Sequence, residues 1–170
     1  EDEIADLVSG DFNRVVYLGG ANFFGLAKES QLKILELTAG QIATQYETPL
    51  GFRHGPKSFV NEETIVILFA TNDAYTRQYE EDIMNEVYHD KIAQEVVSVS
   101  TQKLDHDAKQ FVLDSDLEVP DAYLVLPYVI LGQTVSLHTA VKVGNKPDTP
   151  SPTGTVNRVV QGVVIYDYDK

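Results

Sequence analysis

The sequence predicts an α/β fold, a three-layer α/β/α sandwich built on a mostly parallel sheet of about five strands. Short runs rich in β-branched residues alternate with helical stretches along the chain, and the connections between them are short. The run Thr64 to Ala70 is apolar on both faces, as a central strand covered by helices on both sides must be. Ligands of such sheets bind beyond the carboxyl ends of the strands.

The first strand and helix are marked by a change of pattern at a pair of glycines. Arg14 to Leu18 is a β-branched run that ends at Gly19-Gly20, and Asn22 to Leu37 is rich in Leu, Ala, Lys and Glu. These patterns indicate a strand, a tight turn and a helix. Ile42 to Glu47 is the second strand candidate.

The middle of the chain continues the alternation after a loop. Pro49 to Pro56 is punctuated by Gly and Pro and is expected to be a loop. After the central strand, Asp73 to Asp90 predicts a helix, Glu95 to Ser100 a strand, and Phe111 to Leu113 a shorter strand.

The last helix is predicted from Ala122 to about Val143, after the start signal Pro120-Asp121. Gly144 to Gly154 carries too many prolines for a helix. We therefore expect one domain over residues 1–170, with 1–12 as the end of a linker helix and 145–170 as an extended tail.

The composition excludes several classes of function. With 26 acidic and 13 basic residues the net charge is −13, which disfavours binding to nucleic acid or to anionic membrane surfaces. The chain has no cysteine, so it has no disulfide or thiolate site, which suits a cytoplasmic protein. Its most apolar run, Ala122 to Leu131, is about half the length that spans a bilayer, so we expect a soluble protein.

Two features of the first helix could serve a site. Gly20 and Asn22 stand at the turn into its N-terminus, where free N–H groups favour an anion, although the dinucleotide-binding glycine pattern is absent. Glu29, Lys33 and Glu36 are spaced to share one helix face. From spacing alone, a solvated row of salt bridges is the favoured explanation of this stripe.

Two segments that contain histidine could take part in proton transfer or metal binding. His54 lies in a glycine-flanked loop between Arg53 and Lys57, where an accessible imidazole could exchange protons, although an ordinary surface histidine fits equally well. The run Asp105 to Asp107, with a central histidine, resembles a metal cluster, but three consecutive side chains do not converge on one ion. We expect a solvated turn there and no metal.

Longer stretches of the sequence resemble a known family. Glu29 to Gly40 (ESQLKILELTAG), Pro49 to Lys57 (PLGFRHGPK) and Thr155 to Val163 (TVNRVVQGV) are similar to the sugar isomerase (SIS) superfamily, and the resemblance covers nearly the whole chain. Within it, the chain most resembles the tagatose-6-phosphate ketose/aldose isomerase type, also described as galactosamine-6-phosphate deaminase/isomerase. The resemblance implies a flavodoxin-like SIS domain, the second of two in tandem.

The resemblance also implies roles for individual residues. It implies Glu36 as the general base, Lys33 as the cation one turn before it, and His54 as a ring-opening histidine donated across a subunit interface of a homo-oligomer. No metal or organic cofactor is implied, and the substrate is a small-molecule sugar phosphate. The expected substrate-binding residues are Gly20, Asn22, Glu29, Arg53, Lys57, Arg158 and Gln161.

Two departures from the family pattern limit these expectations. Gln161 stands where a related isomerase has a lysine close to the sugar, and the phosphate-gripping loops of the family belong to a first domain that this sequence lacks. We therefore expect the isolated chain to be inactive. The alternatives are a non-catalytic sugar-phosphate-binding module and a module that only dimerises, through the apolar last helix.

Overall fold

A computed structural model describes residues 2–113, 119–156 and 159–168. Its sheet holds five strands: β1 (Arg14–Gly19), β2 (Ala43–Glu47), β3 (Thr64–Phe69), β4 (Glu95–Ser100) and β5 (Lys109–Val112). All neighbouring strands are parallel, in the order β2-β1-β3-β4-β5. The predicted parallel five-stranded sheet is confirmed, with strand ends shifted by one or two residues.

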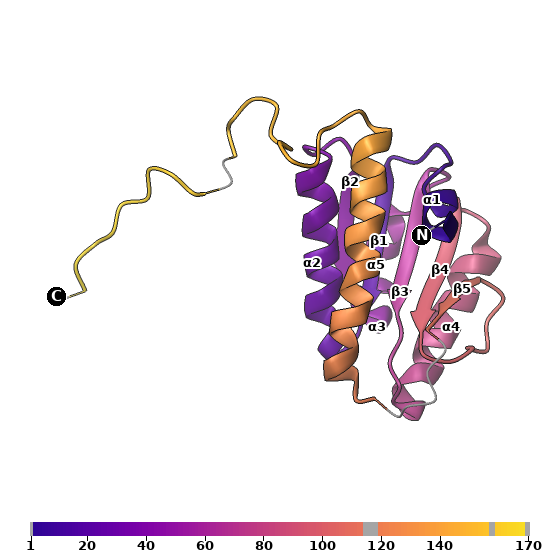
Figure 1. Cartoon of the computed structure of the whole chain (residues 1–170). Coiled ribbons are helices and arrows are strands. Elements are labelled where there is room, and N and C mark those ends of the chain that lie inside the picture. The colour runs from indigo at the N-terminus through magenta and orange to yellow at the C-terminus, as the bar shows by residue number, and fades with distance from the viewer. Residues whose placement is uncertain (1, 114–118, 157–158, 169–170) are drawn as a thin grey trace.

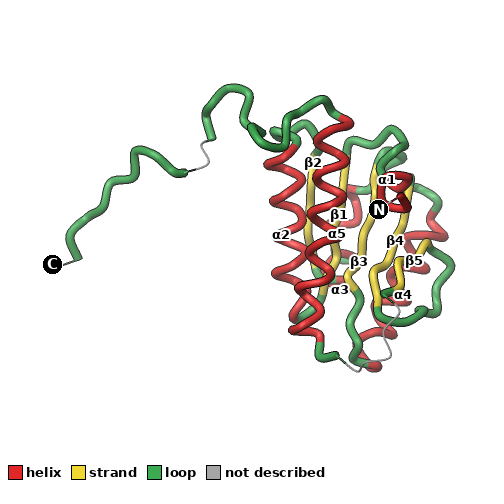
Figure 2. Tube along the Cα trace, viewed as in Figure 1, coloured by secondary structure: helices red, strands yellow, loops and turns green. Residues whose placement is uncertain are grey.

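Helices cover both faces of this sheet, as predicted (Figure 1). One face carries α1 (Asp2–Leu7), α2 (Asn22–Leu37) and α5 (Asp121–Lys142), whose buried residues form one core cluster with alternate residues of the strands. The other face carries α3 (Pro49–Phe52), the 3₁₀ turn η1 (Pro56–Phe59) and α4 (Ala74–Asp90), which pack on the remaining strand residues. Figure 2 shows α2 and α5 running side by side in front of the strands.

The central strands β1 and β3 contribute to both cores because successive side chains point to opposite faces. Val15 and Tyr17 face α2 and α5, whereas Val16 and Leu18 face α4. Every residue of β3 is buried, which explains why the sequence shows no alternation there. On the α5 side, the Tyr17 ring lies 6.0 Å from the ring of Phe69 on β3.

The segment predicted as a loop from Pro49 to Pro56 is partly helical, so that prediction is corrected. Thr48 caps α3, because its hydroxyl accepts a hydrogen bond from the N–H of Gly51 at 3.0 Å. Proline follows at the first helical position, where its fixed φ suits a helix. A proline therefore begins a short helix here instead of preventing one.

α5 is longer than the apolar run Ala122 to Leu131, so the length expected for the most apolar segment was too short. An 18-residue window of this helix has a mean hydropathy of 1.5, enough by length and composition for its 22 residues to cross a bilayer. Eight of them are buried in the domain, and α5 packs closely along α2. These contacts are those of a core helix.

Beyond α5, the tail has no helix or strand in its described part. Asn145 ties its start to the domain, since its amide donates to the carbonyl of Leu37 at 2.7 Å and to that of Pro150 at 2.9 Å. The following residues lead away from the sheet and are exposed (Figure 1). Arg158 lies outside the described residues.

The close approach of α2 and α5 depends on a glycine and predicts a packing effect. A Cβ added at Gly132 of α5 would lie 2.9 Å from the Cβ of Ser30 on α2, whereas one added at Gly25 would meet nothing within 4 Å. Gly132→Ala should therefore lower the free energy of unfolding by ~1–3 kcal/mol relative to Gly25→Ala. Helix propensity cancels between these variants. Urea unfolding measures the difference, and equal stabilities would contradict close packing.

Candidate functional site

The Glu29, Lys33 and Glu36 stripe exists as predicted on the exposed face of α2. The Lys33 ammonium lies 2.9 Å from a carboxylate oxygen of Glu36 and 3.5 Å from one of Glu29. The hydrogen bond to Glu36 is the largest cause of a raised pKa at Lys33, so this group stays positively charged. Roughly a third of the Lys33 side chain and two fifths of each carboxylate side chain remain exposed. A fixed cation between two accessible carboxylates can hold an anionic oxygen while one carboxylate moves a proton.

His54 lies on the other face of the sheet from Glu36, between α3 and η1. It follows α3, which begins next to the carboxyl end of β2, and its side chain is exposed. Glu36 lies at the C-terminus of α2, next to the amino end of β2. Since α2 rises by about 1.5 Å per residue, Glu36 lies ~21 Å along the helix from Asn22. One chain alone does not bring Glu36 and His54 together.

The two cations beside His54 are already paired with α4. Arg53 donates to one carboxylate oxygen of Glu86 at 2.7 Å. Lys57 lies 2.5 Å from the other oxygen and 2.5 Å from a carboxylate oxygen of Asp90. Hydrogen bonding to Lys57 is the main reason that the pKa of Glu86 is lowered. These contacts fix the His54 loop on α4, and they reduce the positive charge available to a substrate phosphate.

The remaining predicted binding residues separate into two places. Gly20 lines a cavity at the carboxyl edge of the sheet, and Asn22 is the first residue of α2 beside it. Gln161 lies in the exposed part of the tail, which leads away from the sheet. The structure of this chain therefore does not bring Gln161 to the Glu36 stripe.

The run Asp105 to Asp107 is largely exposed, with its histidine ring turned towards the sheet. The Nε2 atom of His106 lies 2.8 Å from the hydroxyl of Ser98, and burial lowers the pKa of the imidazole. Among the described residues, no group of three or more His, Cys, Asp or Glu side chains could hold a metal ion.

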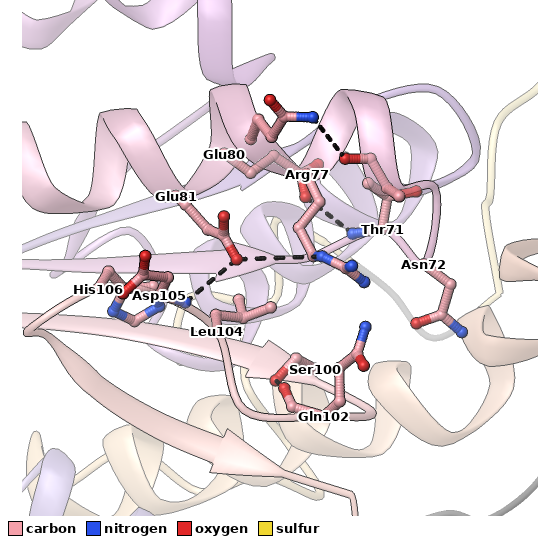
Figure 3. A network of polar contacts seen from close by, with 12 residues as sticks. Thr71, Asn72, Arg77, Glu80, Glu81, Ser100, Gln102, Leu104, Asp105 and His106 are labelled. Atoms are coloured by element: carbon pink, nitrogen blue, oxygen red, sulfur yellow. Dashed lines mark hydrogen bonds and ion pairs between the residues drawn. The ribbon is translucent and has the colours of Figure 1, made fainter.

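Sequence reasoning missed Glu80, a fully buried carboxyl at the cavity. Its Oε2 accepts a hydrogen bond from the N–H of Thr71 at 2.8 Å, as Figure 3 shows, and its Oε1 has no partner among the described residues. Burial raises the pKa of this carboxyl to about 7. A signal was present in the sequence, because Glu80 occupies a core position of the α4 stripe that continues with Ile83, Met84 and Val87.

The nearby start of α5 shows a similar long-range contact. Asp121, which was predicted to help cap α5, accepts hydrogen bonds from the hydroxyl of Thr71 and, at 2.9 Å, from the N–H of Asn72. The residue before it, Pro120, makes no side-chain cap. Asp121 therefore joins α5 to the β3–α4 turn instead of capping its own helix.

An all-parallel five-stranded sheet in this order, covered by helices on both faces, is the fold of the SIS-type phosphosugar isomerases, and the chain has that fold. It is homologous to the D-galactosamine-6-phosphate deaminase AgaS of Escherichia coli O157:H7, with 43% identity over 159 residues, 92% of this chain and 41% of that protein. No protein-family model matches the chain.

Two solved structures agree with this relationship. A putative tagatose-6-phosphate ketose/aldose isomerase from Clostridium novyi NT has a TM-score of 0.91 and 45% identity, covering 98% of this chain and 44% of that one. The tagatose-6-phosphate ketose/aldose isomerase from Escherichia coli has a TM-score of 0.86 and 34% identity, and the match covers 99% of this chain and 43% of that one. The chain thus spans less than half the length of these relatives.

The buried Glu80 carboxyl predicts a pH-dependent stability. Folded Glu80 keeps its proton up to pH about 7, whereas the unfolded side chain releases it near 4.5. The folded state therefore binds more protons between these values, and Glu80 lowers the free energy of unfolding by about 3 kcal/mol as the pH rises through this interval. Glu80→Gln should remove this contribution.

Urea unfolding from pH 5 to pH 8 checks the prediction, with Asp82→Asn as the matched control. Asp82 is an exposed carboxyl on the same helix. In Asp82→Asn, the free energy of unfolding should decrease with pH as it does in the wild type. The free energy of unfolding of Glu80→Gln should rise relative to that of the wild type as the pH increases to about 7. A constant difference across the range would mean that Glu80 titrates normally.

Proposed function

We propose that this chain is the second SIS domain of a phosphosugar isomerase or deaminase that acts on a hexose 6-phosphate, namely tagatose 6-phosphate or galactosamine 6-phosphate. The names of the relatives support this substrate class. Their length supports the tandem arrangement, since this chain matches 41–44% of each. On this proposal, α1 ends the connection from the first domain, and the protein works in the cytoplasm.

The observation that carries the proposed chemistry is the Lys33 to Glu36 contact at 2.9 Å on an accessible helix face. Isomerisation needs one base that removes a proton from a carbon next to the carbonyl and returns it to the neighbouring carbon. The Glu36 carboxylate takes the proton from C2 and delivers it to C1. The Lys33 ammonium stabilises the negative charge that develops on O1 in the enediol. This sequence of steps uses no metal or organic cofactor.

An amino sugar follows the same path until the last step. Removal of the C2 proton gives an enolamine, and protonation at C1 gives a ketimine. Water then adds to the imine carbon and releases ammonia, leaving the ketose. Isomerase and deaminase therefore share the Glu36 step, and they differ in whether the C2 substituent leaves.

The positions of Glu36 and His54 support a homo-oligomer in which His54 acts in a neighbouring subunit, because one chain places them on opposite faces of the sheet. The outer face of α5 also exposes large apolar side chains, as expected for a covered surface. They are Tyr123, Leu126, Ile130, Leu137 and Val141, each at least 46% exposed.

Replacing the proposed base tests the mechanism. In the complete protein, Glu36→Gln keeps the shape of the side chain but cannot accept the proton, so kcat should fall by roughly 10²- to 10⁴-fold. Glu62→Gln, an exposed carboxyl in the turn before β3, is the control and should keep wild-type turnover. Unchanged turnover in Glu36→Gln would exclude Glu36 as the base and leave a binding module as the alternative.

Sugar interconversion and ammonia release should be followed side by side with tagatose 6-phosphate and galactosamine 6-phosphate. Both signals should disappear together in Glu36→Gln, because the proton-transfer step is shared. Loss of one signal with retention of the other would show that the two reactions do not use the same base.

Mixing two inactive variants tests the shared site. Glu36→Gln and His54→Asn proteins, each with low turnover, should recover up to about a quarter of wild-type activity after subunit exchange in a dimer. Mixed dimers contain one site with both native groups. A mixture no more active than its components, with exchange verified by mass spectrometry, would place both groups within one subunit.

A further inference from the structure

A second candidate site lies at the far end of α2 from Glu36. A cavity of about 440 Å3 opens where β1 and β3 end, at the point where the chain order of the sheet reverses. Its volume is in the range of small-molecule sites. Its lining includes Gly20, Thr48, Leu50, Tyr75, Tyr79 and Glu80.

The wall of this cavity contains a buried polar atom that has no hydrogen-bond partner in the part of the chain that the structure describes. Glu80 has no exposed surface, and its Oε1 lacks a partner among the described residues while Oε2 is held by Thr71. A Cβ added at Gly20, on the opposite wall, would lie 3.7 Å from Oε1. An unpaired buried oxygen is costly, so its position at a cavity indicates a ligand group that forms the missing hydrogen bond.

The groups around Glu80 indicate the kind of ligand group that fits. Asp121 of α5 and Glu81 of α4 oppose ionisation of Glu80, and Arg77 of α4 favours it only weakly compared with burial. The carboxyl is therefore present in both forms near neutral pH. A hydroxyl matches both, because it donates to the carboxylate and accepts from the protonated acid. An ammonium group can bond only to the carboxylate, and an anion can bond only to the protonated acid.

The other walls favour a ring with an apolar face. Tyr75 and Tyr79 stand edge to face with ring centroids 5.4 Å apart, and their hydroxyls lie 2.9 Å from each other. Tyr75 is 69% exposed and Leu50 48% exposed, so these surfaces are available to a ligand. Thr48 and Thr76 add hydroxyls at the margin. Aromatic surfaces beside a carboxyl suit a saturated ring, because its C–H groups can pack on the aromatic rings while its hydroxyls form hydrogen bonds with the carboxyl.

We propose that this cavity binds an uncharged sugar ring, with one of its hydroxyls bonded to Glu80 Oε1 and its C–H face packed on Tyr75 and Tyr79. The site lies at the carboxyl edge of the sheet, and the Glu36 stripe lies at the amino edge. It is therefore separate from the proposed proton-transfer site, and it does not depend on the isomerase proposal. A sugar bound here would contact the turn that leads into α2, which carries Lys33 and Glu36.

Binding of methyl β-D-galactopyranoside to the complete protein tests the proposal, because this sugar is uncharged and its ring cannot open. Saturation-transfer NMR and calorimetry at pH 6 and pH 8 should show saturable binding that changes little with pH. Glu80→Met removes the hydrogen bond and should weaken binding by roughly tenfold or more. Gly20→Val fills the cavity between Glu80 and Pro49 and should abolish binding.

Asp82→Asn is the control for changes in charge on α4 and should bind like the wild type. Unfolding midpoints show whether each variant is folded, and Glu80→Gln keeps the proposal testable if Glu80→Met does not fold. The glutamine amide can still bond a hydroxyl, so its affinity should stay within about threefold of wild type, whereas an ammonium ligand would be lost.

Three results would overturn the proposal. The first is an absence of saturable binding, with the cavity holding only solvent. The second is binding of galactosamine without binding of the uncharged galactoside, which would make this an ammonium site. The third is galactoside binding that is unaffected by both Glu80→Met and Gly20→Val.

Discussion

The parallel pairing of β1 with β3 is the constraint on which the rest of this domain depends. Both strands are buried on both faces, so each needs a helical layer on either side, and their alternating side chains contribute to both hydrophobic clusters. The chain first adds β2 on one side of β1 and then β3 on the other. This reversal separates α2 and α3 at the carboxyl edge and leaves the cavity between them.

Ion pairs within the domain determine how much positive charge is available to bind an anionic substrate. The chain carries twice as many acidic as basic residues, and carboxylates bind the cations beside Glu36 and beside His54. Lys33 lies between Glu29 and Glu36, while Arg53 and Lys57 share Glu86. These pairs keep the cations charged and position their loops. A sugar phosphate would need additional positive or hydrogen-bonding groups, and the longer relatives have room for them outside the part that this chain matches.

Much of this fold could be predicted from the sequence because its signals are local. The continuous apolar run of β3, the glycines after β1 and the helical spacing of α2 each depend on neighbouring residues, and all three were located to within one or two residues. The short helix α3 was missed because proline and glycine usually indicate a loop, and the cap provided by Thr48 outweighed that composition.

The sites were harder to predict because they depend on contacts between distant segments. Glu29, Lys33 and Glu36 share a helix face, so their spacing was sufficient. The pairing of Arg53 and Lys57 with Glu86 joins residues about 30 positions apart, and no local pattern indicates it. Glu80 did have a local signal, a carboxyl on an apolar stripe, but its meaning required Thr71 and Gly20 to be placed beside it.

The two ends of α2 have different chemistry, and this difference constrains how the whole protein can work. The C-terminal end presents an accessible carboxylate and a fixed cation, whereas the N-terminal end adjoins a cavity with a buried carboxyl. One helix joins them, since the turn at Gly20 that lines the cavity leads into α2, which carries Lys33 and Glu36. The His54 loop lies on the α4 side of the sheet and Glu36 on the α5 side, so one chain does not bring these two side chains together.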